Sequence, residues 1–172
     1  PLLPLHLLWV NLVTDGLPAL ALVMDPPEAD VMRRPPRDPA EPILGRREWT
    51  RIAWTGLLQA AVTLGVFVAS LDQGLPTARN LAFSTLVFGE LFRAFAARSE
   101  DRVFFEVGAL SNLKLLIVVV FMVAFQLSLH HVPLAMQLLS VAPLGWAESA
   151  LSLGLGLIPV TVLELRKLVV RR

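Results

Sequence analysis

The chain has 172 residues, 55% of them hydrophobic, and its mean hydropathy is +0.66. Soluble domains of this size are less apolar, so the composition excludes an ordinary soluble domain and indicates a membrane protein. The formal net charge of +1 indicates no nucleic-acid partner, and the absence of cysteine excludes disulfides and thiolate metal sites. The chain begins with Pro1 and has no charged signal-peptide segment, so we expect it to be a piece of a longer protein.

The first apolar run, residues 2–24, is long enough to cross a bilayer, since one span needs about 20 residues. Its centre contains Asn11, Thr14 and Asp15, which an α-helix would place on one face because their spacing is i, i+3 and i+4. An ionisable side chain at membrane depth costs at least about 2.5 kcal/mol and by default indicates a functional site. The pattern therefore favours an ion or proton path.

Two helix-weakening residues follow this cluster. Pro18 has no N–H and its ring crowds the carbonyl of Thr14, while Gly16 lowers the resistance to unwinding. We therefore predict a helix that is unwound around Asp15, Gly16 and Pro18, with freed carbonyl oxygens facing protein or a wet cavity. The alternative is a proline-kinked helix in which Asp15 pairs with a neighbour for packing.

The next segment, residues 25–50, is predicted to be a proline-rich loop. Six prolines between residues 25 and 42 exclude a regular helix and favour an extended, polyproline-like chain. Two interpretations stay open, a solvated linker or a rigid strap that docks a soluble domain.

Four further membrane spans are predicted, at residues 52–71, 80–97, 113–129 and 141–165. Gly56 and Gly65 are small enough for close helix approach, and the lone amide of Gln59 suggests a hydrogen bond between helices. Ser111-Asn112 is a plausible N-cap of the fourth span, and Gln126 within that span is interpreted as structural. The predicted fold class is all-α, a polytopic membrane bundle of five transmembrane helices.

The basic residues predict the orientation of these spans. Of the 15 basic residues, every one except Arg79 falls on the side of the proline-rich loop, the 98–112 loop and the C-terminus. Basic loops stay in the cytoplasm, so we expect an integral, multi-pass protein with that loop and the C-terminus cytoplasmic.

A second acid, Glu90, is predicted to lie at the same depth as Asp15. Both sit roughly 13–15 Å from a membrane edge at 1.5 Å per residue, near the middle of an apolar layer of about 30 Å. Two carboxylates in a low dielectric repel unless a cation lies between them or one is protonated. We predict a metal site formed by Asn11, Thr14, Asp15 and Glu90, whose oxygens suit Ca²⁺, Mg²⁺ or Mn²⁺ better than Cu⁺ or Zn²⁺. Ca²⁺ takes six to eight oxygens, so helices outside this chain should complete the site.

Other polar residues in or near the spans receive structural interpretations. His6 is expected at the membrane interface, and the adjacent His130 and His131 point in different directions on a helix, which disfavours a shared metal. Glu164 is expected to pair with a basic residue. Glu148 is interpreted as a structural partner or as snorkelling outward, with a transport role as the alternative.

The stretch Leu8-Trp9-Val10-Asn11-Leu12-Val13-Thr14-Asp15-Gly16-Leu17-Pro18-Ala19 resembles the sixth membrane helix of type II P-type cation-transporting ATPases, most closely the sarco/endoplasmic reticulum calcium pump group. Residues 25–42 resemble that family's loop between helices six and seven. Leu86-Val87-Phe88-Gly89-Glu90 resembles its eighth helix. The resemblance covers the whole chain and implies one domain, residues 1–172, corresponding to helices six to ten.

By this resemblance Asn11, Thr14 and Asp15 correspond to calcium-coordinating positions, with Asp15 bridging two ion sites, and Glu90 corresponds to a ligand of one site. The family's fourth and fifth helices supply the other ligands. Its phosphorylation and nucleotide-binding motifs do not occur in these residues, so ATP and Mg²⁺ would act only through other domains and this fragment alone should be inactive.

The implied function is the membrane part of an ATP-driven pump that moves Ca²⁺ out, with H⁺ counter-transport. Its partners would be the remaining helices and cytoplasmic domains of the same pump and the lipid bilayer. Two alternatives stay open: the same fold pumping Mn²⁺, Na⁺ or H⁺, and a stand-alone membrane protein without ATPase activity.

Overall fold

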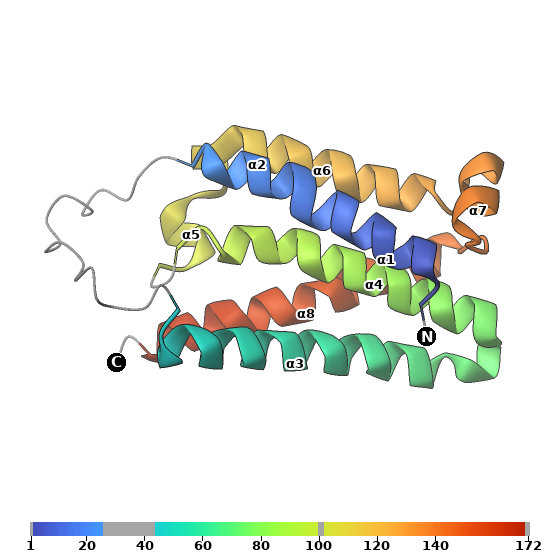
Figure 1. Cartoon of the computed structure of the whole chain (residues 1–172), viewed down its shortest axis with the longest axis horizontal. Helices are drawn as coiled ribbons and strands as arrows, with labels where there is room; N and C mark the ends of the chain where they lie inside the picture. Colours follow the sequence, from blue (N-terminus) through green and yellow to red (C-terminus); the bar gives the residue numbers. More distant parts are fainter. Residues whose placement is uncertain (1, 26–43, 100–101, 171–172) are drawn as a thin grey trace, which may run out of the picture.

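The computed structural model describes residues 2–25, 44–99 and 102–170, and in these ranges the regular structure is entirely helical (Figure 1). Most of the predicted proline-rich loop, residues 26–43, lies outside the described residues. The elements follow each other as α1 (Pro4–Val10), η1 (Asn11–Gly16), α2 (Leu17–Val23), α3 (Arg46–Ala69), η3 (Leu71–Gln73), α4 (Leu75–Ala96), α5 (Phe104–Val107), η4 (Ala109–Asn112), α6 (Leu113–Ser128), α7 (Pro133–Leu139) and α8 (Trp146–Val170).

Four helical stretches of the described chain are long and apolar enough to cross a membrane: Pro4–Val23, Glu48–Ala69, Leu110–Ser128 and Trp146–Val169. The predicted helical membrane bundle is confirmed in this form. Helix α4, which covers most of the predicted span 80–97, is not among the four, and it carries the charged side chains of Glu90 and Arg93. The fifth span therefore stays a prediction.

Helix α4 lies at the centre of the bundle. The pair α2 and α6 packs on one side of it, and α3 and α8 pack on the other (Figure 1). Phe83, Val87 and Leu91 of α4 are fully buried and form one cluster with Val13 and Leu115. Large apolar side chains cover the outside of the surrounding helices, among them Leu12, Leu20, Leu57, Leu64, Ile117, Phe121 and Leu151. So much exposed apolar surface is typical of a protein that faces lipid.

Close helix contact depends on two glycines that the sequence did not single out. A Cβ on Gly156 of α8 would lie 2.6 Å from Cβ of Phe88, and a Cβ on Gly89 of α4 would lie 2.5 Å from Oε1 of Gln59. Gly56 and Gly65, which the sequence indicates as small enough for close approach, make no such contact within the described residues, because nothing there lies within 4 Å of a Cβ built at either residue. Gly56 instead lines an open cavity beside α4.

The polar connections contain short helices that hydropathy did not predict. Within the 98–112 loop lie α5 and η4, and α7 begins at Pro133, whose ring is suited to a first helical turn. The last long helix begins at Trp146 rather than near residue 141. Asn112 caps α6 as predicted, since its side-chain oxygen accepts from the backbone N–H of Leu115 at 2.9 Å.

Candidate cation site

The first membrane-length helix changes its winding at the predicted ligands. Residues Asn11–Gly16 form a π-helix, Gly16 leaves the helical region with φ −72° and ψ −81°, and α2 then begins with Pro18 in its first turn. The helix is thus widened rather than opened, which is milder than the predicted unwinding. Pro18 cannot donate a backbone hydrogen bond. The extra residue in the π turn accommodates this proline, so the helix continues.

Two of the three predicted ligands of this segment have side chains that the structure describes, and their surroundings differ. Asn11 is exposed, and Thr14 is half-buried with its hydroxyl donating to the carbonyl of Val10 at 2.8 Å. The wider π turn rotates Thr14 away from the face of Asn11, because the i, i+3 relationship assumed α-helical winding. The side chain of Asp15 lies outside the described part of the structure.

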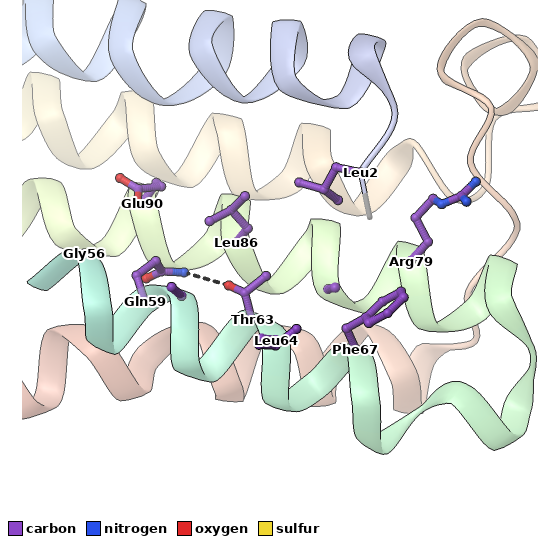
Figure 2. Close-up of a pocket in the computed structure, with 11 residues that line it drawn as sticks. Leu2, Gly56, Gln59, Thr63, Leu64, Phe67, Arg79, Leu86 and Glu90 are labelled. Atoms are coloured by element: carbon purple, nitrogen blue, oxygen red, sulfur yellow. Dashed lines mark hydrogen bonds between the residues drawn. The ribbon is translucent and has the colours of Figure 1, made fainter.

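Glu90 lies on α4, which packs against η1. Its side chain is 16% exposed and forms an ion pair with Arg93 one turn later, whose side chain is 36% exposed. Glu90 also lines a cavity of 580 Å³ between α3, α4 and Leu2. Figure 2 shows Glu90 near one end of this cavity and Arg79 at the other, with Leu86, Leu64 and the polar Gln59 and Thr63 among the residues between them. The structure therefore places the helix of Glu90 beside the segment of Asn11 and Thr14. The predicted pairing of the Glu90 and Asp15 carboxylates stays a prediction, because the side chain of Asp15 is not described.

The amide of Gln59 faces the same cavity from α3 (Figure 2). Its nitrogen donates weakly to the hydroxyl of Thr63 at 3.4 Å, within the same helix. The predicted hydrogen bond from Gln59 to another helix is therefore wrong for the described bond, which stays within α3. Gly89 has no side chain, so the Gln59 amide lies directly against α4.

Within the described residues, no group of three or more His, Cys, Asp or Glu side chains is close enough to hold a metal ion. The described side-chain oxygens of the predicted ligands are the amide of Asn11 and the hydroxyl of Thr14 on η1, and the carboxylate of Glu90 on α4, the helix that packs against η1. Ca²⁺ takes six to eight oxygens, so these groups suit a part of a cation site and not a complete one.

One end of the bundle, which we call the His130 end, is held by neutral hydrogen bonds. His130 is 2% exposed; its Nε2 lies 2.8 Å from Oγ of Ser84, and its Nδ1 lies 3.0 Å from the carbonyl of Ala142. Burial lowers the pKa of His130 below its ordinary value of 6.5, although the Ala142 contact opposes the shift.

The other two histidines also pack structurally. His6 is fully buried, bonds the carbonyl of Leu139 at 2.9 Å and stacks on Phe83, so it packs inside the bundle, and its position at the membrane interface stays a prediction. The ring of Phe83 and the end of α7 at Leu139 lie against it. His131 stacks on Trp146 with ring centroids 4.7 Å apart.

The opposite end, which we call the Asp25 end, is held by charges. The side chain of Arg98 is 1% exposed. It donates two hydrogen bonds to the Asp25 carboxylate, from Nε to Oδ2 at 3.0 Å and from Nη2 to Oδ1 at 2.9 Å. It also donates to the carbonyl of Gly108 at 2.8 Å. Asn112 adds a bond from Nδ2 to the carbonyl of Ala21 at 3.0 Å. The end of α2 is therefore fixed to the loop before α6.

A second charged contact at the Asp25 end joins α8 to the same loop. The ammonium of Lys167 donates to Glu164 and to the carbonyl of Ala96, each at 2.8 Å, and to the carbonyl of Arg102 at 3.2 Å. The predicted ion pair of Glu164 is confirmed. Glu148, at the other end of α8, accepts from the backbone N–H of Gly145 at 2.7 Å, which is the structural role among its two interpretations.

Comparison with known proteins places this arrangement in a family. Residues 1–169 match the family described as cation transporting ATPase, C-terminus. The chain belongs to this family. The resemblance to the C-terminal membrane region of type II P-type ATPases is thereby confirmed.

Individual relatives of this ATPase region are named for calcium transport. A calcium-transporting ATPase of Bacillus subtilis (strain 168) is 37% identical over 175 residues, covering 95% of this chain and 18% of that protein. Calcium-transporting ATPase 1 of Bacillus cereus is 30% identical over 186 residues, covering 98% of the chain and 21% of that protein. The type 2C member 2 calcium-transporting ATPase of Mus musculus is 30% identical over 171 residues, covering 98% and 18%. The chain thus spans about a fifth of the length of these relatives.

Proposed function

We propose that this ATPase C-terminal region supplies part of the Ca²⁺ site and transport path of an ATP-driven pump. The observation that carries the proposal is the π-helical segment Asn11–Gly16, which lies inside a membrane-length helix and packs against the helix of Glu90. π-Helical turns occur frequently at functional sites. Relatives named as calcium-transporting ATPases support Ca²⁺ as the transported ion.

In this proposal Asn11, Thr14, Asp15 and Glu90 are ligands, and other helices of the same pump supply the rest. The exposed side of Asn11 and the cavity beside Glu90 leave room for such helices. ATP and Mg²⁺ act through other domains. The proline-rich loop and the C-terminus lie in the cytoplasm, as the basic residues predict.

The ion pair between Glu90 and Arg93 gives the ion-free site a counter-charge. A divalent cation that binds Glu90 competes with the Arg93 guanidinium, because both are attracted to one carboxylate. When the cation leaves, a proton or Arg93 again neutralises Glu90. Proton counter-transport follows if the carboxylates of the site take up protons in that state.

ATP-dependent ⁴⁵Ca²⁺ uptake by the intact pump in sealed vesicles tests the proposal. We expect Asp15→Asn and Glu90→Gln to abolish uptake or to raise the half-saturating Ca²⁺ concentration at least tenfold, since each removes a charged ligand (about 1.4 kcal/mol per tenfold). Uptake assays with Mn²⁺ and Na⁺ in place of Ca²⁺ test the other cations.

Two matched variants control for loss of a carboxylate as such. Asp72→Asn changes an exposed acid in the turn before α4, and Glu148→Gln keeps an oxygen that can accept from Gly145. Both should transport Ca²⁺ as the wild type does. Normal uptake by Asp15→Asn and Glu90→Gln would refute the ligand assignment, and ATP-independent ion flux would indicate a stand-alone membrane protein.

A further inference from the structure

The first membrane-length helix, Pro4–Val23, which we call the ion-site helix, is attached to α6 immediately before its π-helical segment. Trp9 precedes Asn11 by two residues, and its indole N–H donates to Oε1 of Gln126 at 2.9 Å. The Trp9 ring also packs on Phe125 of α6, with ring centroids 5.3 Å apart. Gln126 is fully buried, so this amide is not exchanging its partners with water.

The partners behind Gln126 fix the direction of its amide. An indole can only donate, so the oxygen of Gln126 faces Trp9 and its nitrogen faces Oγ of Ser84, 3.4 Å away. The carbonyl of Ala142 can only accept, so Nδ1 of His130 carries the hydrogen and Nε2 of the neutral ring accepts from the Ser84 hydroxyl. Each group in this chain of bonds has one consistent role, from Trp9 to Ala142.

A second amide of α6 holds the same helix beyond the π-helical segment. Asn112, which caps α6, donates from Nδ2 to the carbonyl of Ala21 at 3.0 Å. The two amides are 14 residues apart, about 21 Å along α6, and their partners Trp9 and Ala21 are 12 residues apart, about 18 Å along their helix. The π-helical segment Asn11–Gly16 lies between these two attachments.

We propose that Gln126 is a positioning residue for the cation site, and that α6 acts through Gln126 and Asn112 as a splint that sets where the π-helical segment presents its ligands. The inference rests on the proposed function for its ion, but the positioning itself is a property of this chain. Without the Gln126 contact, the segment before Asn11 loses its hydrogen bond to α6 and is held by the packing of Trp9 on Phe125 and by the contacts of His6. The Thr14 hydroxyl bond to Val10 cannot replace that bond, because both of its groups belong to the same helix.

The alternative is that Gln126 only stabilises the bundle, as many buried amides do in membranes. Gln59 is the matched control, because it is also a buried amide on a membrane-length helix, but its described bond stays within α3. Replacing either amide with Met removes the polar group at similar length. Only the Gln126 change removes a contact to the ion-site helix.

The experiment compares the intact wild-type pump with Gln126→Met, Trp9→Phe, the double variant and Gln59→Met. Two quantities are measured: amide hydrogen exchange of peptides covering residues 9–17, and the Ca²⁺ dependence of ATP-driven ⁴⁵Ca²⁺ uptake in vesicles. Trp9→Phe keeps an aromatic ring beside Phe125 and removes the N–H together with the five-membered ring, so it remains informative if Gln126→Met folds poorly.

We expect Gln126→Met and Trp9→Phe each to speed exchange in residues 11–16 by about 3- to 15-fold, the range for one hydrogen bond inside a membrane protein. The half-saturating Ca²⁺ concentration should rise by a similar factor while the maximal rate changes less than about twofold. The double variant should resemble either single one, because both remove the same bond. Gln59→Met should leave exchange in this segment unchanged.

Equal effects of Gln126→Met and Gln59→Met on exchange in residues 11–16 would overturn the inference, as would effects of Gln126→Met and Trp9→Phe that add in full. A wild-type pump without Ca²⁺ uptake would overturn the proposed function, while the exchange comparison would still decide the positioning role. Faster amide exchange in residues 11–16 with an unchanged Ca²⁺ dependence of uptake would show that α6 holds this helix without positioning its ligands. That result would overturn the positioning role of Gln126.

Discussion

The two ends of this helical bundle are held together by different chemistry. At the Asp25 end, guanidinium and ammonium groups of Arg98 and Lys167 reach carboxylates and carbonyls of neighbouring segments. At the His130 end, the contacts join neutral amide, hydroxyl, indole and imidazole groups. Losing one partner at the first end leaves a partly buried ion, whereas at the second it leaves a neutral group, so the two ends should respond very differently to substitution.

The largest effect is expected from Arg98→Met. The change removes the Arg98 bonds to the Asp25 carboxylate and to the Gly108 carbonyl, and breaking a buried ion pair in this way costs about 3–5 kcal/mol. The measurement is the local opening free energy of residues 102–112 from amide exchange in the intact protein. Lys114→Met, at an exposed lysine of α6, is the control and should change it little. Equal losses in both variants would contradict the role given to Arg98.

Lys167→Met should have the next largest effect. It removes the donor to the Ala96 and Arg102 carbonyls and to Glu164, and hydrogen bonds of a charged group contribute about 1.5–3 kcal/mol. Exchange of residues 94–104 should accelerate accordingly. Glu164→Gln keeps an acceptor oxygen and should have a smaller effect; a larger one would show that the carboxylate, not the ammonium, holds this contact.

Asn112→Ser tests a neutral contact placed at the charged end. Serine retains a capping oxygen for α6 but cannot reach the Ala21 carbonyl, so we expect a loss of only about 0.5–1.5 kcal/mol, typical of one neutral hydrogen bond. Amide exchange at residues 21–25 should report it. A loss as large as that of Arg98→Met would show that location rather than charge sets the strength of these contacts.

The pH dependence of the His130 end should be the smallest of these effects. The pKa of His130 is lowered by burial first, raised by the Ala142 contact, lowered by His131, raised by Glu148 and lowered by His6. Because the folded pKa lies below 6.5, the stabilisation from neutral His130 is complete above pH 6.5 and is lost as the pH falls through the folded value. Exchange of residues 128–132, corrected for intrinsic rates, should accelerate between pH 7 and 5, and His130→Gln should remove this acceleration.

The sequence predicted much of the helical arrangement, because membrane spans follow from long apolar runs. The run around Val119 became α6 close to the expected bounds, whereas α3, formed by the run around Thr63, already begins at Arg46, inside the predicted loop 25–50. Local side-chain chemistry was also predictable where it depends on near neighbours. The cap at Asn112 and the pair of Glu164 with a basic residue both involve groups three residues apart.

Contacts between distant segments could not be predicted in the same way. Gln126 was expected to be structural, but nothing local indicates Trp9 or Ser84 as its partners, which are 117 and 42 residues away. Small residues in an apolar run are equally plausible contact points until the helices are placed, so Gly56 was favoured over Gly156. The type of winding at Asn11–Gly16 depends on how the chain accommodates Pro18, and the sequence shows only that some departure from the α-helix is needed.

Two buried polar side chains of the central helix α4 bond to segments that follow it in the chain. The hydroxyl of Ser84 bonds to Gln126 and His130, and Asn80 donates to the carbonyl of Ala142 at 3.2 Å. During synthesis from the N-terminus, α4 therefore emerges before any of these partners exists. These contacts of α4 form only after residue 142 has been synthesised, and a chain halted before that residue would keep Asn80 and Ser84 in the middle helix without the partners that the complete bundle provides.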